Sequence, residues 1–207
     1  MRLPVLLSLF IITSAGSATA QNAYLKLGQQ ALWAGDFRAA IRHLERACLA
    51  DSTNSDAQWM LGYSYYHSEN YKKSIAAYSR VIAVKPADAS AYYYRARAKS
   101  YMAKDIQLTS VEKEKCLLGA ISDFTKALLI KPSDFKIYQN RGIAYRDYGT
   151  FKLQANTKAY DKGRGISALK ASIADLEKAL NEDPSRADLE SLLELSKEKL
   201  ATAQGHH

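Results

Sequence analysis

Apolar residues recur at helical spacing along most of the chain. Between residues 59 and 66, apolar and small side chains fall three or four positions apart, as they do on one face of an α-helix. Polar residues 68–70 interrupt this pattern, and a second amphipathic run covers residues 74–84 before Pro86 ends it. The pattern therefore predicts two helices joined by a short turn.

This pattern of paired helices repeats along the chain with a period of 34 residues, since Leu27-Gly28 recurs as Leu61-Gly62. Other pairs at the same shift are Phe37 and Tyr71, Ile41 and Ile75, Leu44 and Tyr78, and Ala47 and Val81. A third copy carries 12 extra residues and a fourth carries 18. Because one helix pair buries only one face, stacked copies are expected to complete a shared core.

The period and the residue pattern resemble the tetratricopeptide repeat, which reads W-x2-L-G-x2-Y, then A-x3-F, then P. The four copies are residues 21–54, 55–88, 89–134 and 135–186. The position where the two helices of a repeat must cross closely holds Gly28, Gly62, Ala96 and Gly142. The resemblance implies an all-α fold, a right-handed α-solenoid of about four helix pairs. A polar-faced capping helix is expected over residues 187–203, followed by a tail over residues 204–207.

The first 20 residues have the order of a secretory signal peptide. Arg2 precedes an apolar run over residues 3–12, and small residues end in an Ala-x-Ala site before Gln21. The run is shorter than the roughly 20 apolar residues that span a bilayer, and no cysteine near the site suggests a lipid anchor. The sequence thus predicts an exported, periplasmic or secreted protein whose mature chain begins at Gln21 and has no transmembrane segment.

Composition and motifs argue against an enzyme. The chain is 47% hydrophobic with a formal charge of +8, which is typical of a folded and basic protein. Two cysteines, Cys48 and Cys116, exclude a disulfide-dense scaffold, and we expect them to be unpaired because several helix layers separate them. Nucleophile-elbow, zinc-protease and phosphate-loop motifs are missing from the sequence. No catalytic residue, metal or cofactor is predicted.

Arginine and aspartate occur together in two copies. Arg95 and Arg141 stand where the first two copies have leucine, and Asp123 and Asp175 lie at the matching place of the second helix. A partly buried arginine needs a partner, so the pattern predicts an ion pair within each of these repeats. The alternative is that both arginines hold a carboxylate of a ligand.

The resemblance implies that the first helix of each pair lines a concave groove. The aromatic and arginine residues that fall on this face are Trp59, Tyr63, Tyr66, Tyr93, Arg97 and Arg146. These residue types dominate binding hot spots, so they are the candidate partner-binding residues. The alternative is that the rings only pack within the repeats. Chaperone-binding members place Lys and Asn where this chain has Leu25 and Gln29, which argues against recognition of a C-terminal acidic tail.

Both insertions fall between the two helices of a repeat. The first contains Thr109-x-x-Glu112, the signature of a capping box that would lengthen the following helix. The second, residues 150–168, has four basic residues against one acidic residue, which predicts a mobile basic loop. This loop is either a functional element or simply a solvated one.

Two functions are compatible with the sequence. The first is a non-catalytic scaffold that binds a peptide or protein in the groove, within an envelope assembly or a secretion complex. The alternative is a carbohydrate-binding module that stacks sugars on the groove aromatics. An exported protein makes nucleic acid a poor explanation for the basic charge, and an anionic envelope surface a better one. A peptide binder should depend on Arg97 and Arg146, and a glycan binder on Trp59 and Tyr63.

Overall fold

The structure is a computed structural model that describes residues 22–155, 157–182 and 184–205. Within these ranges the chain forms helices and short connections without a strand, which confirms the all-α prediction. The chain divides into two units, residues 1–86 and 87–207, and each is described by itself. The predicted signal peptide lies outside the described residues, as does the end of the predicted tail.

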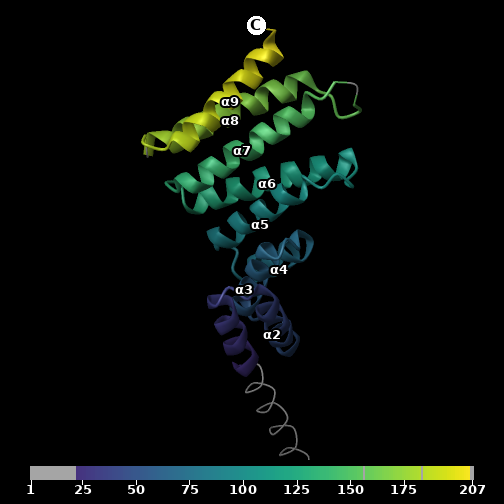
Figure 1. Ribbon diagram of the computed structural model, residues 1–207, viewed down its shortest axis with the longest axis vertical. Coiled ribbons are helices and arrows are strands. Elements are labelled where there is room, and N and C mark those ends of the chain that lie inside the picture. Colours follow the sequence, from purple (N-terminus) through teal and green to yellow (C-terminus); the bar gives the residue numbers. More distant parts are fainter. Residues whose placement is uncertain (1–21, 156, 183, 206–207) are drawn as a thin grey trace, which may run out of the picture. The chain divides into compact units, whose positions relative to one another are not determined.

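The first unit contains two helix pairs. Its helices cover residues 22–33, α2 (Phe37–Ala50), α3 (Ser55–His67) and α4 (Tyr71–Val84), shown from purple to blue in Figure 1. Acidic or amide side chains cap the starts of α2, α3 and α4, and Asp36 accepts a 2.8 Å hydrogen bond from the amide of Ala39. Because the polar turns lie where the period places them, the helix boundaries follow the repeat.

Glycine sets the spacing inside each pair of the first unit. A Cβ atom at Gly28 would lie 2.6 Å from Cγ of Leu44, and one at Gly62 would lie 3.0 Å from the ring of Tyr78. Leu44 and Tyr78 are completely buried, so a larger residue at either glycine would displace a core side chain. The close crossing predicted at these positions is confirmed.

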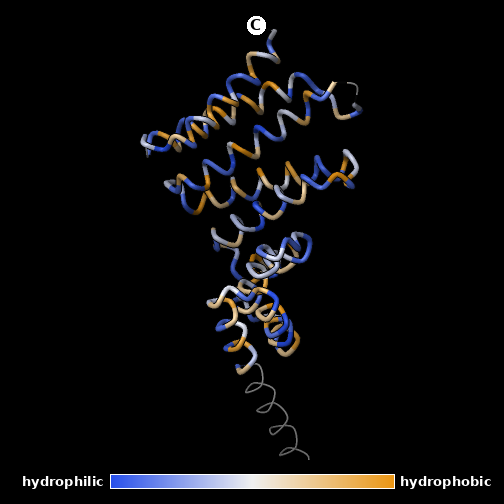
Figure 2. Tube along the Cα trace, in the orientation of Figure 1, coloured by the Kyte–Doolittle hydropathy of each residue, from blue (hydrophilic) through white to orange (hydrophobic). Residues whose placement is uncertain are grey.

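The described residues of the second unit form a stack of five helices. They are α5 (Ala89–Met102), α6 (Ser110–Ile130), α7 (Phe135–Lys152), α8 (Lys162–Glu182) and α9 (Ala187–Gln204), shown from blue-green to yellow in Figure 1. Each helix packs on the next in sequence, and α7 also contacts α5 and α9. Apolar positions recur along every helix in Figure 2. The most deeply buried large side chains of this unit include Phe124, Leu169, Leu176 and Leu189.

The first insertion is built as predicted. The Thr109 hydroxyl accepts a 3.3 Å hydrogen bond from the amide of Glu112, and the Glu112 carboxylate accepts one of 2.9 Å from the amide of Thr109. This capping box starts α6, which is 21 residues long. The extra residues therefore form the connection to α6 and its first turns.

The prediction of a basic loop over residues 150–168 is wrong for most of its length. Helix α7 continues to Lys152 and α8 begins at Lys162, so the connection is confined to residues 153–161. Lys152 is only 5% exposed, and its Nζ lies 3.3 Å from the Glu114 carboxylate. Two glycines allow α7 and α8 to pack closely at these ends, because a Cβ at Gly149 would lie 2.9 Å from the carbonyl oxygen of Gly165. The insertion therefore extends a tightly packed pair of helices.

Candidate partner-binding groove

The first arginine–aspartate pair is present and has a third member. Nε and Nη2 of Arg95 donate to the two oxygens of Asp123 at 2.8 and 2.7 Å. Nζ of Lys99 donates to the same carboxylate at 2.7 Å. Asp123 is 4% exposed, so two cations hold one buried acid. Lys99 lies one helical turn after Arg95, a spacing that puts both side chains on one face of α5.

The second pair has the same two-bond geometry. Nε and Nη2 of Arg141 donate to Asp175 at 2.7 and 2.8 Å, and Nη1 donates to the Thr125 hydroxyl at 3.1 Å. The hydrogen bond to Asp175 raises the pKa of Arg141 above its ordinary value. Because Arg95 and Arg141 already donate to acceptors of the protein itself, the arrangement favours a structural role for them over binding of a ligand carboxylate.

The six candidate binding residues lie in different units. Trp59, Tyr63 and Tyr66 belong to α3 in the first unit. Tyr93 and Arg97 belong to α5, and Arg146 belongs to α7, in the second unit. A single groove that includes both sets stays a prediction.

The aromatic residues of α3 pack on one another. The rings of Trp59 and Tyr63 are stacked, with centroids 5.6 Å apart, and both residues are half-buried. The Trp59 ring also makes a T-shaped contact with the buried Tyr78 ring, with centroids 6.1 Å apart. Tyr66 is only 7% exposed and its ring packs 5.9 Å from that of Tyr71. Contrary to the prediction, Tyr66 therefore offers little surface to a partner.

Tyr93 connects the first helices of the two repeats in the second unit. Its hydroxyl accepts a 3.3 Å hydrogen bond from Nδ2 of Asn140 on α7. The Arg97 guanidinium lies 5.7 Å from the Tyr93 ring, and the Phe124 ring lies 5.9 Å from it on the other helix of the repeat. Burial raises the pKa of the Tyr93 hydroxyl. Tyr93 is thus half-buried with its position set by three neighbours.

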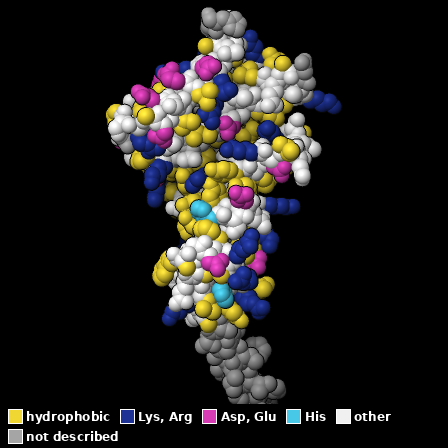
Figure 3. Space-filling model, viewed as in Figure 1, with side chains coloured by type: hydrophobic (Ala, Val, Ile, Leu, Met, Phe, Trp, Pro, Cys, Tyr) yellow, Lys and Arg dark blue, Asp and Glu magenta, His cyan; other side chains and the backbone are white. Residues whose placement is uncertain are grey.

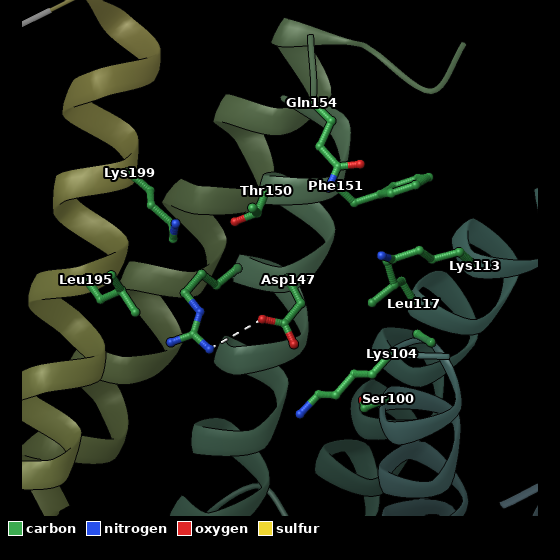
Figure 4. Close-up of a pocket in the computed structure, with 12 residues that line it drawn as sticks. Ser100, Lys104, Lys113, Leu117, Asp147, Thr150, Phe151, Gln154, Leu195 and Lys199 are labelled. Carbon is green, nitrogen blue, oxygen red and sulfur yellow. Dashed lines mark hydrogen bonds and ion pairs between the residues drawn. The ribbon is translucent and has the colours of Figure 1, made fainter. Parts of the chain in front are cut away.

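A cavity of about 340 Å³ lies next to Arg146, between α5, α6, α7 and α9 (Figure 4). Its charged lining residues are Lys104, Lys113, Arg146, Asp147 and Lys199. Its apolar walls include Leu117, Phe151 and Leu195. A second cavity of about 520 Å³ shares Thr150, Gln154 and Lys199 with the first and continues along α7 and α9. We call these two adjoining cavities the groove of the second unit, and its lining is both basic and apolar.

Most of these cations could not be found from the repeat period. The groove register identified Arg146, but Lys104 lies in the connection before α6, Lys113 in the first turn of α6, and Lys199 in α9. Their only sequence signal is positive charge in elements that flank the repeats. On the face of the second unit that Figure 3 shows, Lys and Arg side chains border exposed hydrophobic atoms.

Other chemistry is sparse in the part of the chain that the structure describes. It contains no group of three or more His, Cys, Asp or Glu residues that could hold a metal ion. Both cysteines are free thiols, and burial raises the pKa of Cys48 to about 11, which keeps it protonated at neutral pH. No helix among the described residues is long and apolar enough to cross a bilayer.

Comparison with known proteins gives a family-model match over part of the chain and a shared fold. The tetratricopeptide-repeat family model matches residues 25–91. Among solved structures, MamA 41-end from Desulfovibrio magneticus RS-1 is similar with a TM-score of 0.67 and 17% identity over 90% of each chain. TTC0263, a thermophilic tetratricopeptide-repeat protein of Thermus thermophilus, has a TM-score of 0.52 and 19% identity, over 85% of this chain and 98% of that one. No curated protein gives a significant sequence match.

Proposed function

Since the chain has the fold of tetratricopeptide-repeat proteins and residues 25–91 match their family model, we propose that it is a non-catalytic scaffold that binds a peptide or protein partner along the first helices of its repeats. The observation that carries this proposal is the groove of the second unit. There, α5 carries the adjacent Tyr93 and Arg97, and Arg146 of α7 lines a cavity with apolar walls and basic side chains. Aromatic rings and arginines around a concave apolar surface are what polypeptide partners bind best.

Site-specific photo-crosslinking tests this proposal. A benzophenone side chain would replace Tyr63 on α3 or Tyr93 on α5, and the protein would be irradiated in extracts of its host. We expect each position to yield an adduct with a polypeptide, identified by mass spectrometry. Matched controls on second helices are the exposed Lys72 on α4 and Lys126 on α6. Equal adducts at all four positions, or none at any of them, would contradict a groove-binding scaffold.

The proposed place of action is the periplasm or the cell exterior, within an envelope assembly or a secretion complex. Its support is the sequence of residues 1–21. We expect the exported protein to begin at Gln21 when its N-terminus is measured by mass spectrometry. An intact Met1 in the mature protein would contradict export through a cleaved signal peptide.

A carbohydrate ligand is the second candidate, and the stacked pair Trp59 and Tyr63 favours it. A glycan array would separate the two functions. A glycan binder should bind defined sugars and lose them on Trp59→Ala, whereas a protein scaffold should show no sugar binding. For the same exported protein, an anionic envelope surface is a better additional partner than nucleic acid.

A further inference from the structure

We propose that the cavity between α5, α6, α7 and α9 receives one acidic side chain of the partner, whose carboxylate accepts hydrogen bonds from Arg146 and Ser100. This inference rests on the proposed function, because it assumes that a polypeptide lies in the groove. It adds a defined position and a defined chemical group to that function. Two buried donors, the charge of the lining and its apolar walls support it.

Arg146 has a hydrogen-bonding deficit that the two structural arginines do not share. Its side chain is 14% exposed, and its buried Nη1 has no acceptor among the described residues. Its Nη2 makes one long contact, 3.3 Å from Oδ1 of the adjacent Asp147. Arg95 and Arg141 each make two short bonds to an aspartate instead. Since a buried donor without an acceptor is costly, an incoming acceptor would be stabilising here.

Ser100 is the second unsatisfied donor, and it comes from a different helix. Serines inside helices commonly bond to the carbonyl one turn earlier, as Ser64, Ser79 and Ser196 do at 2.8, 2.7 and 3.0 Å. The buried Ser100 hydroxyl has no partner among the described residues, although it too lies inside a helix. Ser100 and Arg146 line the same cavity. An ionised carboxylate has only acceptor atoms and can satisfy both groups.

The remaining lining selects for an anion attached to an apolar segment. Lys104, Lys113 and Lys199 add three positive charges to that of Arg146, against the single negative charge of Asp147. In Figure 4 the Lys104 and Lys199 side chains extend from opposite sides toward the middle of the cavity. Leu117, Phe151 and Leu195 supply apolar walls. A volume of about 340 Å³ suits a glutamate side chain together with an apolar neighbour, whereas a free inorganic anion would leave the walls unused.

Asp147 acts as a competitor of the ligand in this arrangement. Its carboxylate contacts the same guanidinium that would hold the partner's acid, and like charges at one site oppose each other. The isosteric change Asp147→Asn should therefore increase affinity for an acidic ligand. A purely structural Arg146–Asp147 pair predicts no such gain.

The test uses two short probes that differ in one charge, acetyl-Leu-Glu-Leu-amide and acetyl-Leu-Gln-Leu-amide. Binding to the full chain is followed by NMR titration, with circular dichroism as a check on folding. We expect the glutamate peptide to bind about tenfold more tightly than the glutamine peptide, as charge-assisted hydrogen bonds would require. Arg146→Gln should remove this difference, and Ser100→Ala should reduce it. Asp147→Asn should strengthen binding, and the exposed control Lys170→Gln on α8 should leave it unchanged.

Equal binding of the two peptides would overturn the proposal, and so would weaker binding by Asp147→Asn. Inorganic phosphate forms a third arm: if it displaces the glutamate peptide at concentrations below the peptide's own Kd, the site is one for phosphate. If Arg146→Gln fails to fold, Ser100→Ala and Asp147→Asn still decide the outcome. If a benzophenone at position 93 crosslinks one polypeptide but the two peptides bind equally, the acid-binding site is rejected and the scaffold function is kept. If the glutamate peptide binds more tightly but no polypeptide is crosslinked, the cavity still binds an acid and the scaffold function is rejected.

Discussion

Replacing Asp123 by alanine should lower the free energy of unfolding by about 3–5 kcal/mol, because it leaves two partly buried cations without their acid. Arg95 and Lys99 both bond to this carboxylate, and their side chains are 17% and 21% exposed. Chemical denaturation of Asp123→Ala, followed by circular dichroism, measures the loss. The repeat that follows offers a matched comparison. Asp175→Ala should cost less, because Arg141 keeps its bond to Thr125.

A double-mutant cycle tests the cause of this loss. Adding Arg95→Leu to Asp123→Ala should recover part of the stability, since leucine is the residue that the first two repeats carry at this position. Lys99 should limit the recovery, although its long side chain can turn its charge toward water. Strictly additive losses would show that Arg95 and Asp123 do not stabilise each other.

Replacing Phe124 by alanine should destabilise the second unit by about 3–5 kcal/mol, the usual cost of a large cavity in a core. Phe124 is 1% exposed, and its ring lies 5.9 Å from that of Tyr93. The change should also remove a neighbour of the side chain at position 93, so a benzophenone placed there should crosslink the partner less. Denaturation curves and crosslinking of the same variant measure the two effects.

Phe124→Leu is the matched control for this cavity. It keeps most of the buried volume, so its loss should stay below about 1.5 kcal/mol. The crosslinking yield of a benzophenone at position 93 should then be close to the yield measured with Phe124 in place. A yield that stays high in folded Phe124→Ala would show that Phe124 does not position the groove.

The features that follow from local pattern were predictable. Helical spacing and polar turns indicate helix pairs, because a helix buries one face and its boundaries depend on nearby residues. Close packing at Gly28 and Gly62 was predictable too, since the period places these glycines opposite a buried partner. The pairing of Arg95 with Asp123 could be proposed because two copies of the repeat changed together.

The placement of residues outside the repeat pattern was determined by tertiary packing. The second insertion looked like a basic loop, yet Gly149 and Gly165 let its residues continue two helices, and Lys152 is buried against Glu114. Lys199 reaches the cavity only because α9 packs on α7. Whether a buried donor has an acceptor depends on every helix that surrounds it, so the unsatisfied groups of Ser100 and Arg146 became visible only once the helices were packed.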